Sequence, residues 1–240
     1  MLLKNSLKLV HTSDTHLGDP YGHPDSHNSF TNVINSLDHI KPDFLLIAGD
    51  IFDNEQVNNS VIDFFLKEIK RAEVPVIILP GNHDLMHETS VYKRTAFECQ
   101  PSNLFIFKDP LGSLIDFNEY GISFWGKAMY EHSPKFKPLS NIYLNNRNHW
   151  LIGLAHGHFE SFDYKSGRSS LIFPDDIANS KCDYIALGHW DIHTDVSQNG
   201  IPAFYSGCPS KMSGQKTGMI NLVILDRKQG VSITQYPLAN

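Results

Sequence analysis

The chain has 240 residues, and its 26 acidic residues outnumber the 20 Lys and Arg, which gives a formal charge of −6. This balance argues against a protein that holds nucleic acid mainly through a basic face, because such binding needs clustered Lys and Arg. The length suits one large core of the α/β or two-sheet kind. Three widely spaced cysteines indicate a reducing, cytoplasmic compartment without a disulfide framework, and we expect all three to be small buried hydrophobes. No apolar run approaches the length of a membrane span.

The first eighty residues alternate short apolar runs with helical patterns. Apolar, β-branched runs predict strands at 7–10, 44–48 and 76–79. Between them, apolar residues at helical spacing predict helices at 30–40 and from 59 or 60 to 69, and Pro42 ends the first. The alternation predicts a βαβαβ unit and therefore a parallel sheet.

The remainder of the chain carries shorter strands and more turn signals. We expect a helical stretch at 89–97, brief strands at 104–107, 114–117 and 122–125, and buried strands at 151–155 and 184–187. Two hairpins follow, at 192–205 around Asn199-Gly200 and at 220–236 around residues 228–230. Residues 133–148, rich in Pro and Asn, predict a loop.

Residues able to bind metal follow each of the five buried strands directly. They are Asp14 and His16, Asp50, Asn82 and His83, His156, and His189 and Asp191. The carboxyl ends of parallel strands meet at one crevice, where an α/β sheet binds its ligands. Carboxylate, amide and imidazole donors without thiolate suit Mn²⁺, Fe²⁺ or Zn²⁺ better than Ca²⁺ or an iron–sulfur cluster.

Each of these signals also has a structural interpretation. Gly-Asp is a frequent turn dipeptide, and a single strand-end histidine such as His156 is often a core residue. His158 is an alternative ligand or a phosphate contact, although strand alternation favours His156. We expect His11 to pack beneath the site, and His23 and His27 to be solvated or to edge the substrate cleft.

In this order, the five motifs resemble the calcineurin-like metallophosphoesterase superfamily. The motifs are Asp14-x-His16, Gly49-Asp50, Gly81-Asn82-His83-Asp84, His156 and Gly188-His189-x-Asp191. Residues 11–18, 48–54 and 205–211 further resemble the nuclease subunit of the bacterial SbcCD complex, a family of DNA repair exonucleases. The match covers nearly the whole chain.

The resemblance implies a single catalytic domain over residues 1–240, folded as a four-layer αββα sandwich of two mixed sheets flanked by helices. It also implies two divalent metal ions. Mn²⁺ is the expected metal, and Fe²⁺, Zn²⁺ or Mg²⁺ are the alternatives. Asp14, His16, Asp50 and Asp191 would hold one ion, and Asp50, Asn82, His156 and His189 the other.

His83 would then protonate the leaving oxygen, with Asp84 or Asp53 orienting it. His158, Trp190 and Ser206 are candidate substrate contacts, and the alternative for Trp190 is packing against the sheet. The implied activity is that of a phosphodiesterase acting on DNA. The alternatives are a phosphodiesterase or phosphatase for small nucleotides or other phosphorylated metabolites and a scaffold without catalysis.

The sequence departs from the family pattern in three places. Asp191 replaces the histidine of Gly-His-x-His, which favours harder ions such as Mn²⁺, and recruitment of His193 is the alternative. Cys208 stands where relatives commonly carry Ser. The chain stops at Asn240, so we expect neither a capping domain nor the segment that docks a coiled-coil ATPase.

Overall fold

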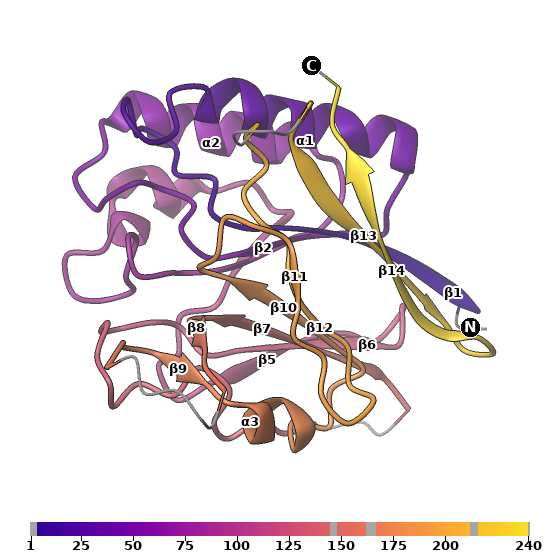
Figure 1. Cartoon of the computed structure of the whole chain (residues 1–240). Helices are drawn as coiled ribbons and strands as arrows, with labels where there is room; N and C mark the ends of the chain where they lie inside the picture. The colour runs from indigo at the N-terminus through magenta and orange to yellow at the C-terminus, as the bar shows by residue number, and fades with distance from the viewer. Residues whose placement is uncertain (1–3, 145–147, 162–166, 212–215, 240) are drawn as a thin grey trace.

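The computed structural model describes residues 4–144, 148–161, 167–211 and 216–239 (Figure 1). Its first sheet has the strand order β14-β13-β1-β2-β3-β4. The parallel strands are β1 (Ser6–Thr12), β2 (Phe44–Ala48), β3 (Val76–Leu79) and β4 (Leu104–Ile106), and the antiparallel hairpin of β13 (Met219–Asp226) and β14 (Gly230–Pro237) completes the edge. Every residue of β2 and β3 is buried, as continuous apolar runs require in a sheet covered on both faces.

The second sheet has the order β11-β12-β10-β7-β6-β5. Its four inner strands are parallel: β12 (Ala203–Tyr205), β10 (Tyr184–Gly188), β7 (Trp150–His156) and β6 (Ile122–Gly126). The edge strands β11 (Thr194–Asp195) and β5 (Ser113–Phe117) run antiparallel, and β8 (His158–Phe159) pairs separately with β9 (Leu171–Ile172).

The sheets pack face to face, and helices cover their outer faces (Figure 1). Helices α1 (Ser26–Ile40) and α2 (Asn59–Arg71) cover the first sheet. Phe30 and Phe65 lie in the apolar cluster between these helices and the sheet. A second cluster around Phe44 and Phe124 fills the space between the sheets. A third lies under α3 (Pro174–Ala178) and includes Ile177. The expected four-layer sandwich is confirmed, and among the described residues the α-helix of the fourth layer is the five-residue α3.

Two expected elements differ from the prediction. The stretch 89–97 forms two short 3₁₀ helices, Val91–Lys93 and Thr95–Cys99. Arg94 between them is extended, and its guanidinium donates to the carbonyls of Glu55 and Val57, which breaks the helix. The first strand of the hairpin at 192–205 shrinks to β11, although its Asn199-Gly200 turn has the expected positive φ at both residues.

The cysteine prediction is correct for two of the three residues. Cys182 and Cys208 are buried, but Cys99 is exposed at the end of the second 3₁₀ helix. The expected loop has no helix or strand over 133–144 or at 148, and its residues 145–147 lie outside the described part. Among the described residues, no helix is both long and apolar enough to cross a membrane.

Candidate metal centre

The predicted ligands come together where the strands of both sheets end. The loop after β1 pairs with the loop after β2: the Asp14 amide donates to the Gly49 carbonyl at 3.0 Å, and the His16 amide to the Asp50 carbonyl at 3.0 Å. The amide of His189, which follows β10 of the second sheet, donates to both carboxylate oxygens of Asp14 at 3.0 and 3.1 Å. These contacts join the strand ends of the two sheets into one cluster.

Four of the predicted ligands have left-handed backbone conformations. The φ angles are 53° at Asp14, 43° at His16, 51° at Asp50 and 110° at His189. A non-glycine residue in this region costs about 1–3 kcal/mol and persists only where its surroundings fix it. Such residues concentrate at functional sites, so the strain marks these strand ends as more than ordinary turns.

Two glycines in the motifs are required because another side chain occupies the space of their missing Cβ. A Cβ at Gly49 would lie 2.1 Å from Nδ1 of His156, and one at Gly81 would lie 2.1 Å from Oδ1 of Asp50. Any larger residue would therefore displace a predicted ligand. The Gly-Asp and Gly-Asn pairs thus have a packing reason beyond turn formation.

The group predicted for the second ion brings side-chain oxygen and ring nitrogen atoms within hydrogen-bond distance of one another. Oδ1 of Asn82 lies 3.1 Å from Nε2 of His156 and 2.9 Å from Nδ1 of His189, and Oδ2 of Asp50 lies 3.2 Å from the same Nε2. Nδ1 of His156 faces the Ala48 carbonyl at 2.9 Å, so it carries the hydrogen and Nε2 presents a lone pair. A neutral His156 would set its Nε2 lone pair against Oδ1 of Asn82 and Oδ2 of Asp50, and either a proton on Nε2 or a metal ion relieves that contact.

Burial and mutual charge shift the pKa values of this group. Burial alone would raise the pKa of Asp50, but the facing His156 imidazole outweighs it and holds that pKa below its usual range. Burial lowers the pKa of His156, but Asp50 outweighs it and raises the value to about 9. Burial raises the pKa of Asp14 to about 7 and lowers that of His189 to about 3. Without metal, the proton on His156 supplies positive charge where the residues favour a cation.

The residues predicted for the first ion are arranged around His16. Ligand atoms of His16, Asp50 and His83 lie within 4.8 Å of one another, as do those of His16, His23 and Asp191. Nδ1 of His16 is buried without a hydrogen-bond partner, and coordination of a cation would satisfy this nitrogen. His193 instead packs against Phe204 with a ring separation of 5.7 Å, so the structure brings Asp191 to this position.

The predicted acid, His83, lies on the open side of the cluster. Its side chain is 43% exposed, and its Nδ1 donates to the Asp53 carbonyl at 2.6 Å. The backbone amide of His83 donates to Oδ1 of Asp50 at 2.9 Å. The Asp53 carbonyl therefore orients the ring. The alternative prediction, that Asp84 orients His83, was wrong. The Asp84 carboxylate instead accepts hydrogen bonds from the backbone amides of the loops after β2 and β3.

The three candidate substrate contacts occupy different environments. Trp190 donates from Nε1 to Nδ1 of His158 at 2.9 Å and stacks on Tyr205, with ring centroids 4.5 Å apart. Both His158 and Trp190 are partly buried beside the cluster. The Ser206 hydroxyl is buried, 2.9 Å from the Ser13 hydroxyl, and joins two strand-end loops. A role for any of them in substrate binding remains a prediction.

Two further histidines in this region were not predicted as site residues. His23 stacks on His16, with ring centroids 4.5 Å apart and 15° between the ring planes. The Asp191 carboxylate, with Cys208 and Asp19, raises the pKa of His23 to about 10. His132 lies 6.1 Å from His189 between ring centroids. Both come from loops, where strand and helix periodicity give no signal.

The chain belongs to the calcineurin-like phosphoesterase family, because the family's sequence model matches residues 7–192. The resemblance inferred from the motifs is thereby confirmed. The family uses a dinuclear divalent metal site, for which the cluster offers candidate ligand groups. Family and fold together support a hydrolase that acts on phosphoric esters.

Among similar proteins, the SbcD component of the nuclease SbcCD from Staphylococcus epidermidis is 25% identical over 243 residues, covering 84% of this chain and 60% of that protein. A probable cyclic nucleotide phosphodiesterase of Moraxella catarrhalis is 27% identical over 88 residues, covering 37% of this chain and 31% of that protein. The chain thus spans less than two thirds of either relative. A dimetal phosphatase from Danio rerio superposes with a TM-score of 0.61 at 9% identity, over 97% of this chain and 99% of that one, which is a likeness of fold alone.

Proposed function

We propose that the chain is a metal-dependent phosphodiesterase that hydrolyses DNA with a metal-activated hydroxide. The observation that carries the proposal is the convergence of acceptor atoms from both sheets. Oδ1 of Asn82 lies within 3.1 Å of ring nitrogens of both His156 and His189. Without metal, N–H groups of the two rings bridge to this oxygen; a divalent ion would replace those protons and bind all three donors at once.

The proposed ligands are those of the family pattern. Asp14, His16, Asp50 and Asp191 would hold the first ion, and Asp50, Asn82, His156 and His189 the second. Carboxylate, amide and imidazole donors make Mn²⁺ the first choice, with Fe²⁺, Zn²⁺ or Mg²⁺ as alternatives. When bound, two ions lower the pKa of a shared water and neutralise the phosphoryl oxygens.

His83 is proposed as the acid that protonates the leaving oxygen. Because Nδ1 donates to the Asp53 carbonyl, the transferred proton comes from Nε2 of the imidazolium. The neutral ring that remains keeps its bond to Asp53 and therefore its orientation. His158 and Trp190 are proposed to contact the substrate beside this position.

DNA is the leading substrate because the nuclease relative aligns with most of this chain, whereas the cyclic nucleotide phosphodiesterase aligns with about a third. A small nucleotide is the second candidate. It is favoured by the formal charge of −6, because a small nucleotide does not need the broad basic face that nucleic-acid binding uses. The two candidates require the same metal chemistry and differ in the leaving group.

A substrate panel tests the proposal. The purified chain is treated with EDTA, reloaded with Mn²⁺ and assayed on linear single-stranded DNA, bis-p-nitrophenyl phosphate, p-nitrophenyl phosphate and cyclic nucleotides. We expect cleavage of the generic diester and of DNA. An Asp50→Asn variant, purified in parallel, controls for contaminating nucleases. Cleavage of the diester without DNA would support the small-substrate alternative, and inactivity on the whole panel with Mn²⁺ would support the scaffold.

The cellular setting remains part of the proposal. We place this chemistry in one catalytic domain over residues 1–240 of a cytoplasmic protein. The three cysteines, none of them in a disulfide, agree with a reducing compartment. We propose a phosphoester as the substrate of this site.

A further inference from the structure

His23 lies beside the proposed first ion, although it comes from the loop between β1 and α1. Its Nε2 is 3.8 Å from Oδ1 of Asp191, and its side chain is 13% exposed. His16, His23 and Asp191 present one ligand atom each, all within 4.8 Å of one another. Two ligands about 2.0–2.2 Å from one ion stand about 3–4 Å apart, so the separation of His23 and Asp191 is that of two donors to a common ion.

Asp19 fixes which nitrogen of His23 faces the cluster. Its Oδ2 accepts from Nδ1 of His23 at 3.1 Å. The same carboxylate accepts the backbone amides of Tyr21, Gly22 and His23 at 2.8 to 2.9 Å, which closes the loop around it. With Nδ1 bound to Asp19, it is Nε2 that faces Asp191, and a neutral ring would direct its lone pair there. A carboxylate behind a histidine is the usual support for a metal-ligating imidazole.

Charge gives an independent reason for a further neutral donor at this position. With Asp191 in place of a histidine, the proposed first-ion group contains three carboxylates, from Asp14, Asp50 and Asp191, and one imidazole. A second imidazole adds a donor without more negative charge, which matters where a phosphate must approach.

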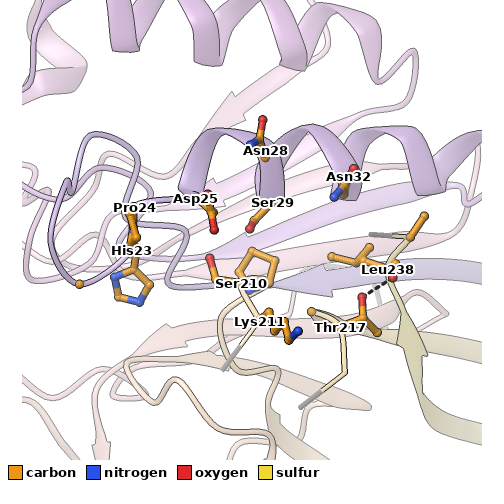
Figure 2. Close-up of a pocket in the computed structure, with 14 residues that line it drawn as sticks. His23, Pro24, Asp25, Asn28, Ser29, Asn32, Ser210, Lys211, Thr217 and Leu238 are labelled. Atoms are coloured by element: carbon orange, nitrogen blue, oxygen red, sulfur yellow. Dashed lines mark hydrogen bonds between the residues drawn. The ribbon is translucent and has the colours of Figure 1, made fainter. Parts of the chain in front are cut away.

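His23 also borders a cavity that lies outside the proposed metal cluster. The cavity is between α1 and the loop after β12, and Asp25 and Lys211 line it together with His23 (Figure 2).

We propose that His23 is a ligand of the first metal ion and that Asp19 is its positioning residue. The inference rests on the dinuclear site of the proposed function, and it assigns this chain a ligand outside the five strand-end motifs. The rival role is a counter-charge: an imidazolium that neutralises Asp191 and leaves the metal to the other residues. The two roles predict opposite effects on metal affinity.

The test is titration of Mn²⁺ into the EDTA-treated full chain, followed by calorimetry and by the electron paramagnetic resonance signal of free Mn²⁺. We expect two bound ions in the wild type. His23→Ala should weaken the binding of one ion at least about tenfold, and Asp19→Asn should weaken the same ion about 10–100-fold. His27→Ala is the matched control, because His27 is a nearby histidine in the first turn of α1 that packs against Phe64, with ring centroids 4.5 Å apart. It should bind both ions as the wild type does.

With Co²⁺ bound, the visible absorption of His23→Ala should differ from that of the wild type, because a nitrogen ligand is lost. Unchanged or tighter Mn²⁺ binding by His23→Ala would overturn the proposal in favour of the counter-charge. If His23→Ala does not fold by circular dichroism, His23→Gln and Asp19→Asn carry the same test. The substrate panel is scored separately: a wild type whose metal binding depends on His23 but which cleaves no diester refutes the proposed function and leaves this inference standing.

Discussion

Asp84 fixes the two loops that carry most of the cluster, and its replacement tests that role. Its Oδ2 accepts the backbone amides of Ile51 and Phe52 at 2.8 and 3.2 Å and the Tyr92 hydroxyl at 2.6 Å. Its Oδ1 accepts the Gly81 amide at 2.7 Å. All four partners are donors, so a fully buried carboxylate satisfies them only through its oxygens. In Asp84→Asn, an NH₂ group would face at least one of these donors.

The expected loss follows from the number of bonds. A hydrogen bond to a charged group contributes about 1.5–3 kcal/mol, and disrupting a buried charged arrangement costs about 3–5 kcal/mol. We therefore expect Asp84→Asn to lower the free energy of unfolding by about 3 kcal/mol, or the Tm by about 6–12 °C for a chain of this size. Tyr92→Phe removes one of the four bonds and should cost about 1.5 kcal/mol, the lower end of that range.

Thermal unfolding in EDTA measures these losses without the stabilisation that metal binding adds. Tyr92→Phe serves as the matched control, since it leaves the carboxylate and the three amides in place. Burial, with the nearby Asp50, raises the pKa of Asp84, and a protonated Asp84 would resemble Asn. An Asp84→Asn variant that melts within about 2 °C of the wild type would show that the group is protonated, which would refute the reasoning.

Three further predictions concern single groups. His83→Gln should lower turnover about 10²–10⁴-fold with both ions retained, as measured by steady-state kinetics and metal analysis, and loss of metal would contradict its assignment as the acid. Asp50→Ala should lose both ions in the same analysis, because the proposed bridge serves each; retention of either would disprove the bridge. Burial would raise the pKa of Asp19, but the Tyr21, Gly22 and His23 donors lower it to about 2. The resulting stabilisation, at most about 2 kcal/mol, is full above pH 4 and is lost as the pH falls toward 2. The difference in unfolding free energy between wild type and Asp19→Asn in EDTA should shrink over that range, and a constant difference would contradict the shift.

The fold was predictable because its strands are marked by composition. The runs at 44–48 and 76–79 are apolar throughout, and only a strand covered on both faces needs such a run. The helix expected at 89–97 did not form because a long-range contact sets the local conformation. The Arg94 side chain donates to carbonyls of the loop before α2. Local periodicity cannot encode that contact. Exposure of Cys99 follows from the same segment, which ends at the surface.

Parallel topology made much of the candidate site predictable. Once five strands run parallel into two packed sheets, their carboxyl ends meet, and the residues after them meet with no further information. His23 follows no strand. The Asp19 carboxylate, which captures three consecutive backbone amides and the ring, sets its position. These four bonds are local, within four residues of Asp19, but neither strand nor helix periodicity marks such a loop, and the sequence showed only Asp and His four residues apart.

The backbone of the cluster connects stability to its proposed chemistry. Asp14, His16, Asp50 and His189 keep left-handed conformations that cost free energy, and Gly49 and Gly81 leave space that ligands occupy. Relaxed turns could end these strands at lower cost. They would direct the side chains elsewhere, since a change in φ swings the Cβ away from the cluster. The buried amide donors to Asp84 and Asp14 hold the strained turns in place. The fold thus gives up stability to direct the candidate ligands toward one another, as a preorganised form of the proposed metal site would require.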